Sequence, residues 1–138
     1  MNAIADTGFL VALVRDYDQY HDWADEISER IAWPVITCEA VLAETAFHLR
    51  SALAVMEMLQ EHVVSLAFDC DKHIDSLHQL ARRYADRQPD LADLCLIRMS
   101  ELYPRHTILT TDEADFRVFR RNKREVIPIL CPPHRKRT

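Results

Sequence analysis

Glycine is almost absent from this sequence: Gly8 is the only one in 138 residues. A phosphate-binding loop of the G-x-x-x-x-G-K-S/T type and a dinucleotide-binding G-x-G-x-x-G turn both need several glycines at fixed spacing. A serine-hydrolase elbow, G-x-S-x-G, also needs more than one. The sequence therefore excludes nucleotide binding by these two motifs and gives no support to a serine hydrolase.

Paired cysteines and long apolar runs are also missing. The four cysteines, Cys38, Cys70, Cys95 and Cys131, stand far apart without a C-x-x-C pair, and each lies in or beside apolar sequence. This arrangement favours buried free thiols over a zinc knuckle or a redox couple. No apolar run approaches the roughly 20 residues of a membrane span, and Asp6 stands where a signal peptide carries positive charge. We expect a cytoplasmic protein without a membrane partner.

Short apolar stretches recur at 3–6, 34–37, 63–68, 107–111 and 126–130, and segments with helical spacing lie between them. Strands that alternate with helices are typical of a parallel sheet covered on both faces. The sequence predicts an α/β fold, a three-layer α/β/α sandwich whose central, mainly parallel sheet has about five strands.

The length of 138 residues fits one compact domain, which we place at 1–131, followed by a basic C-terminal tail at 132–138 that we expect to be disordered. The net charge of -5 hides an asymmetry along the chain. Residues 1–70 carry 12 acids and 3 bases (-9), and residues 71–138 carry 10 acids and 14 bases (+4). A basic end of this kind can hold phosphates.

Several acids are expected at one edge of this sheet, because the carboxyl ends of parallel strands lie on the same side. Asp6 follows the first predicted strand, and Asp112 follows the fourth, with Asp115 three residues later. Asp93 lies in the first turn of a predicted helix, and Glu44 stands mid-helix among apolar neighbours. Each acid taken alone also fits a turn, a helix cap or a solvated helix face, and these alternatives stay open.

Acids that converge at one edge need a counter-ion. Two carboxylates about 5 Å apart repel by roughly 3 kcal/mol at an effective dielectric constant of about 20. Carboxylate oxygens without cysteine or histidine nearby favour Mg²⁺ or Mn²⁺ over zinc. Such an ion lowers the pKa of a bound water and stabilises charge that develops on a phosphoryl oxygen. The converging acids therefore predict a magnesium or manganese site.

Four segments together resemble the PIN-domain family, and in particular the VapC toxins of bacterial toxin–antitoxin pairs. In chain order they read ADTGFLVAL, CEAVLAETAFHL, PDLADLCLIRMSE and ILTTDEADFRVFRRNKREVIPIL. No segment is highly specific alone, but their order and spacing are. The resemblance implies the α/β/α fold and a function: an Mg²⁺- or Mn²⁺-dependent endoribonuclease that hydrolyses RNA phosphodiester bonds as a toxin component.

The resemblance also implies a four-acid catalytic site of Asp6, Glu44, Asp93 and Asp112. Asp6, Asp93 and Asp112 would hold the metal, and Glu44 would ligate it or orient the attacking water. A homodimer and a cognate antitoxin protein are implied as partners besides the RNA.

Further residues match the family's pattern less closely. Asp115 and Asp90 correspond to a secondary acidic site. Gly8 departs from the pattern, because members usually have serine there, while Thr7 can cap the helix or reach a metal-bound water.

Three arginines are candidates for contact with the RNA backbone on grounds of charge and position, namely Arg117, Arg120 and Arg121.

Two other functions stay open. The stretch VVSLAFDCDKH, a strand followed by D-x-D, resembles the opening of a haloacid-dehalogenase-type phosphatase with Asp69 as nucleophile and Asp71 as acid. Against it, His73 stands where such enzymes usually have threonine or valine, and the motif comes mid-chain. The second alternative is a non-catalytic PIN-like module that binds RNA or protein.

Overall fold

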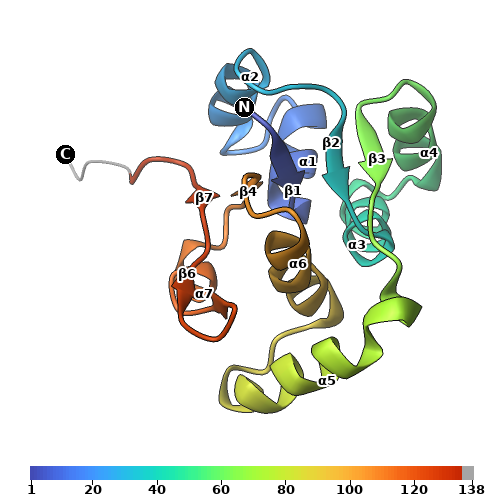
Figure 1. Ribbon diagram of the computed structural model, residues 1–138. Helices are drawn as coiled ribbons and strands as arrows, with labels where there is room; N and C mark the ends of the chain where they lie inside the picture. The colour runs from blue at the N-terminus through green and yellow to red at the C-terminus, as the bar shows by residue number, and fades with distance from the viewer. Residues whose placement is uncertain (135–138) are drawn as a thin grey trace.

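The structure is a computed structural model that describes residues 1–134, and along the chain it alternates short strands with helices (Figure 1). Of the predicted tail 132–138, residues 132–134 have no regular secondary structure, and 135–138 lie outside the described residues. No helix within 1–134 has both the length and the apolar character needed to cross a membrane. The strands of the main sheet are β1 Ala3–Ala5, β2 Val35–Thr37, β3 Val64–Leu66, β4 Thr107–Leu109 and β7 Ile129–Leu130.

Helices fill the connections between these strands, and a hairpin lies between the last helix and β7. The α-helices are α1 Thr7–Val14, α2 His21–Ser28, α3 Glu39–Leu49, α4 Ala52–Gln60, α5 Ile74–Arg83, α6 Leu91–Leu102 and α7 Glu113–Phe116. Two 3₁₀ turns, η1 Cys70–His73 and η2 Ala85–Arg87, flank α5, and the hairpin strands are β5 Arg120–Arg121 and β6 Glu125–Val126.

The main sheet has the strand order β3-β2-β1-β4-β7, and all neighbouring strands run parallel. Right-handed crossovers place α1 to α4 on one face and α5 to α7 on the other. In agreement, α1 packs on α2 and α3, whereas α6 packs on α5 and against β1 and β4. The fold class predicted from the sequence is confirmed.

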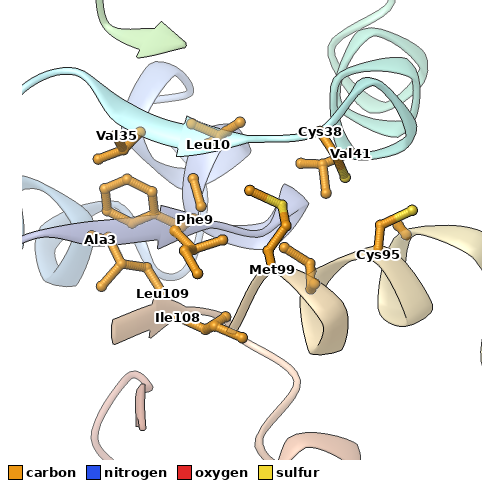
Figure 2. Packing of buried hydrophobic residues seen from close by; sticks show 14 of the residues in the cluster. Ala3, Phe9, Leu10, Val35, Cys38, Val41, Cys95, Met99, Ile108 and Leu109 are labelled. Atoms are coloured by element: carbon orange, nitrogen blue, oxygen red, sulfur yellow. The ribbon is translucent and has the colours of Figure 1, made fainter. Parts of the chain in front are cut away.

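The core lies around β1, whose three residues are all buried. Figure 2 shows Phe9, Val35, Met99 and Ile108 converging there from α1, β2, α6 and β4. A strand that is enclosed on both faces has an uninterrupted run of apolar residues, which explains why β1 consists only of Ala-Ile-Ala before Asp6. The end of β1 is therefore a rigid point from which the chain leaves the sheet.

One predicted strand is wrong in extent. The stretch 126–130 was expected to be a single strand, but it divides into the end of β6 and the separate β7. Pro128 lies between the two and has no N–H group for a strand ladder. The β5–β6 hairpin itself turns through Asn122 and Lys123, which both have positive φ and were not predicted as a turn.

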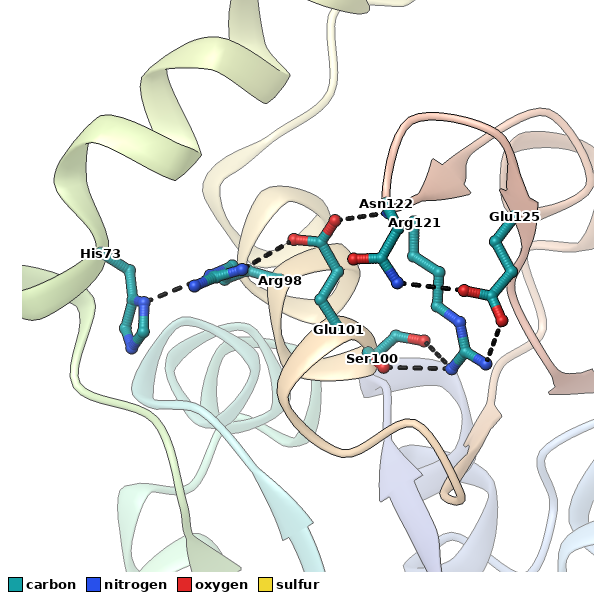
Figure 3. Close-up of polar contacts among 7 residues, drawn as sticks. All are labelled: His73, Arg98, Ser100, Glu101, Arg121, Asn122 and Glu125. Atoms are coloured by element: carbon teal, nitrogen blue, oxygen red, sulfur yellow. Dashed lines mark hydrogen bonds and ion pairs between the residues drawn. The ribbon is translucent and has the colours of Figure 1, made fainter.

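A buried arginine ties this hairpin to α6. The guanidinium of Arg121 donates from Nη1 to the Ser100 carbonyl oxygen at 3.0 Å and from Nη2 to Glu125 at 3.1 Å (Figure 3). Nη1 also donates to the Pro104 carbonyl oxygen at 3.0 Å. Only 6% of the residue is exposed. Arg121, predicted to contact RNA, has its guanidinium bound inside the protein.

A second set of polar contacts continues from α6 in both directions. Arg98 donates to Glu101 at 3.1 Å and to Nδ1 of His73 at 3.2 Å, and Glu101 also accepts from the Asn122 N–H at 2.6 Å. Figure 3 shows the chain of contacts from η1 across α6 to the hairpin. These charge-assisted hydrogen bonds therefore connect η1, α6 and the β5–β6 hairpin.

We expect Arg121→Ala to lower the free energy of unfolding by at least about 1–3 kcal/mol, because buried carbonyl acceptors lose their donor. Arg117→Ala is the matched control, since Arg117 is exposed and its pair with Glu113 at 3.2 Å lies at the surface. Exposed ion pairs contribute about 0–1 kcal/mol. Urea denaturation compares the two, and equal losses would contradict the structural role of Arg121.

Candidate functional site

The carboxyl ends of β1 and β4 form the point at which the sheet reverses its strand order. From β1 the chain continues to β2 on one side, and from β4 it continues to β7 on the other. Ligands in open α/β sheets bind at such a point. The Asp6 N–H donates to the Leu109 carbonyl at 3.0 Å, so the first residue after β1 is held directly beside β4.

Asp6 is buried, with 9% of the residue exposed, and both of its carboxylate oxygens accept hydrogen bonds. Oδ1 accepts from the Thr7 N–H at 2.7 Å, which caps α1, and Oδ2 accepts from the Thr110 hydroxyl at 2.6 Å. Burial raises the pKa of Asp6, against the effect of these two bonds. The carboxylate is therefore fixed in position and poorly solvated.

Glu44 points from α3 toward the same place. The Thr7 hydroxyl donates to its Oε2 at 3.0 Å, so the residue after Asp6 connects the two acids. Burial raises the pKa of Glu44, and the nearby Asp90 carboxyl raises it further. The alternative of a side chain that extends to solvent does not describe Glu44, because it is half-buried among acids.

Asp90 and Asp93 form a capping box at the start of α6, directly after Pro89. The Asp93 N–H donates to Asp90 at 2.8 Å, and the Asp90 N–H donates to Asp93 at 3.2 Å. Burial, followed by the negative charge of Asp90, raises the pKa of Asp93 to about 7. Asp6 and Asp112 add to this repulsion, so these acids lie within electrostatic reach of one another.

Asp112 and Asp115 are positioned by the turn after β4. The Thr110 hydroxyl accepts from the Asp112 N–H at 3.0 Å, and Asp112 in turn caps α7 by accepting from the Asp115 N–H at 3.2 Å. Burial raises the pKa of Asp112, and the charge of Asp115 adds to the effect. Asp115 itself pairs with Arg87 at 2.8 Å.

All six predicted acids line one cavity of about 540 Å³. With Asp18 the cavity has seven carboxylates, and no lysine or arginine of residues 1–134 lines it. Tyr20, His48 and Gln88 also line it, but none of them was predicted, because none belongs to a strand end or a helix start with a recognisable pattern.

The predicted arginines are not among the residues that line this cavity. Arg117 is exposed, and Nη1 of Arg120 donates to the carbonyl oxygens of residues 117, 118 and 119. Arg87 was missed, because nothing in its local sequence marks it, although its guanidinium is bound to one of the cavity's acids.

The donor set of the cavity suits a hard divalent cation, because it consists of carboxylate and hydroxyl oxygens. Within residues 1–134, however, no three histidine, cysteine, aspartate or glutamate side chains are already spaced to hold a metal ion. Each of the six predicted acids is instead bound by a helix cap, a hydroxyl or Arg87. The residues fit such an ion in the chemistry of their oxygen atoms.

Gly8 owes its place to close packing against the turn after β4. A Cβ atom added at Gly8 would lie 2.1 Å from Oγ1 and 2.9 Å from Cγ2 of Thr111. The serine expected from the family resemblance has no room here, and the hydroxyl that borders this part of the cavity comes from Thr111 instead.

Asp69 and Asp71, the acids of the phosphatase alternative, lie elsewhere. Both are exposed, and Asp69 caps η1 by accepting from the Asp71 N–H at 3.1 Å. They follow β3, the edge strand of the sheet, and line a different cavity from Asp6. The structure does not combine these two acids with the cavity at the point of strand reversal.

The comparisons with known proteins bear on the fold. Neither the models of protein families nor the sequences of curated proteins match this chain. Among solved structures, the chain is similar to Mycobacterium tuberculosis VapC20, a toxin that cleaves the sarcin–ricin loop, with a TM-score of 0.68 and 19% sequence identity. The match covers 78% of this chain and 87% of VapC20. It confirms, at the level of the fold, the resemblance to VapC-type PIN domains.

We expect Gly8→Ala to destabilise the protein by about 1–3 kcal/mol, as over-packing does, although alanine within a helix normally gains up to about 1 kcal/mol over glycine. Thr111→Ala removes the two clashing atoms, Oγ1 and Cγ2. The double variant should therefore recover most of the loss, which urea denaturation of all four proteins measures. Additive effects would show that the two residues are not in contact.

We expect the free energy of unfolding of the metal-free protein to fall as pH rises from about 4 to 7. The folded-state pKa of Asp93, about 7, lies above its ordinary value of 3.8, so the folded protein binds more protons in this range. At pH 8, Asp93→Asn should raise the melting temperature in EDTA, because it removes a repelled charge and keeps the capping oxygen. Asp75→Asn, an exposed acid in the first turn of α5, is the control and should give no increase.

Proposed function

We propose that this chain is a divalent-metal-dependent endoribonuclease that acts as the toxin of a toxin–antitoxin pair. The observation that carries the proposal is the cavity at the point of strand reversal, which seven carboxylates line and which no lysine or arginine of the described part of the chain reaches. Burial and mutual repulsion act against the charge of Asp6, Glu44, Asp93 and Asp112. A cation that enters such a cavity offsets the repulsion among its carboxylates.

Asp6, Asp93 and Asp112 are the proposed ligands of Mg²⁺ or Mn²⁺, and Glu44 is a further ligand or the group that orients water. When bound, such an ion lowers the pKa of water and stabilises charge on the phosphoryl group. The threonine hydroxyls on Asp6 and Glu44 hold both carboxylates in place. The raised pKa of Glu44 supports the role of orienting water, because it suits a group that accepts a proton.

The RNA backbone must be held beside an acidic cavity that repels it, so cations at its margin are needed. Arg87 is the first candidate, because its guanidinium is already bound to Asp115. Arg117 and Arg120 remain proposals on charge and position, whereas the guanidinium of Arg121 is committed to the interior. Asp90 and Asp115 form the proposed secondary acidic site.

The proposed partners are an antitoxin protein and a second copy of the chain, in the cytoplasm. Both rest on the family resemblance. They are supported by large apolar side chains that stay exposed on α3 and α4, namely Phe47, Leu53 and Met56.

We expect the purified protein to cleave RNA with Mg²⁺ or Mn²⁺ and not with EDTA. Ribosomal RNA is the first substrate to test, because VapC20 cleaves the sarcin–ricin loop. Asp6→Asn and Asp93→Asn should each reduce cleavage by at least about 100-fold, since even groups that only orient a metal ligand contribute about 10- to 100-fold. Cut ends are mapped by primer extension.

Asp69→Asn is the matched control, because it removes the same charge from an exposed acid outside the cavity. It should leave cleavage unchanged, and its failure to cleave would favour the phosphatase alternative. Cleavage that survives Asp6→Asn would contradict the proposal. Binding of RNA without cleavage, together with no rise in melting temperature on adding Mn²⁺, would favour the non-catalytic module.

A further inference from the structure

Three of the four cysteines meet at one cavity outside the acidic site, although they are distant in the sequence. Cys38 directly precedes α3, Cys70 begins η1, and Cys95 lies in α6. All three line a cavity of about 740 Å³. Cys131 lines another cavity, beside Pro132 and Pro133. The fold therefore assembles a group of thiols that sequence spacing alone does not reveal.

Cys38 and Cys95 form the inner pair of this group. Their thiols lie close enough for each to change the pKa of the other. Figure 2 shows Cys38 at the start of α3 and Cys95 on the facing α6. Both residues are 2% exposed, and both are free thiols. A disulfide between them requires Cα atoms less than about 7 Å apart and Cβ atoms that face each other.

The surroundings of Cys38 suit a nucleophilic sulfur. The Cys95 thiol lowers the pKa of Cys38 most, burial opposes this effect, and the N–H groups of Val41 and Ala40 in the first turn of α3 lower the pKa further. A helix N-terminus is a common setting of a reactive cysteine. Access comes from the cavity, whose other lining residues include the half-buried Cys70 and the exposed Asp69 and Asp71.

We propose that Cys38 and Cys95 are an oxidation site at which a peroxide forms an intramolecular disulfide. The Cys38 thiolate attacks one oxygen of hydrogen peroxide, the O–O bond breaks, and hydroxide leaves and takes a proton to become water. The Cys95 sulfur then attacks the sulfenic acid at Cys38 and loses its proton, and a second water leaves. Two thiols lose two electrons in total, and the two peroxide oxygens gain them.

The new bond would join two helices that both carry acids of the proposed active site. Cys38 lies six residues before Glu44, and Cys95 lies two residues after Asp93. Oxidation therefore fixes the start of α3 to the first turns of α6. Any effect on RNA cleavage rests on the proposed function, whereas formation of the disulfide does not.

The test is oxidation of the full reduced chain with hydrogen peroxide, followed by alkylation of the remaining thiols and mass spectrometry. The wild type should keep two of its four alkylatable thiols and stay monomeric on a denaturing, non-reducing gel. After trypsin digestion, a disulfide should link peptides 31–50 and 88–98, which contain Cys38 and Cys95. This measurement needs no variant and so does not depend on the folding of one.

Single serine variants separate the four thiols. Cys131→Ser is the matched control and should form the same linked peptides, as should Cys70→Ser, whereas Cys38→Ser and Cys95→Ser should not form them. Four free thiols after treatment, a link between 51–72 and 88–98, or only disulfides between chains would each overturn the proposal.

Discussion

The constraint on which the site depends is the repulsion among many carboxylates that gather at the end of a buried strand. β1 is enclosed by apolar side chains, and the chain leaves it at Asp6, whose two carboxylate oxygens accept bonds from Thr7 and Thr110. Glu44, Asp93 and Asp112 then reach the same cavity from α3, α6 and the turn after β4. Burial and repulsion oppose their ionisation, so the folded chain stores unfavourable electrostatic energy at the point where ligands bind in such sheets.

Helix caps make this concentration of charge tolerable. Asp6, Asp90 and Asp112 each accept a backbone N–H at the start of a helix, where a negative charge is favoured. Asp93 returns a bond to the Asp90 N–H, and Asp115 is neutralised by Arg87. The same residues thus serve the fold as caps and the site as oxygen donors, which explains why each acid taken alone also suits a structural role.

The sequence predicted the strands of the main sheet, except for the extent of the last one, and six of the seven acids of the cavity, because both follow from local pattern and strand direction. Glu44 was the informative case, since a carboxylate among apolar helix residues needs a polar partner, and that partner is Thr7. Arg121 was misjudged, because its charge is visible in the sequence but its acceptors, Ser100 and Pro104, are not. The thiol group was missed for the same reason: only the packing of α3 against α6 brings Cys38 to Cys95.

The hydroxyl of Thr110 serves two acids at once: it donates to the Asp6 side chain and accepts from the Asp112 N–H. Because threonine is branched at Cβ, its χ1 rotation is stiff and its oxygen has little freedom to follow one neighbour alone. Asp6 and the backbone of Asp112 are consequently coupled in their motion. Displacement of either acid by an incoming group is transmitted between adjacent strands through a single oxygen atom.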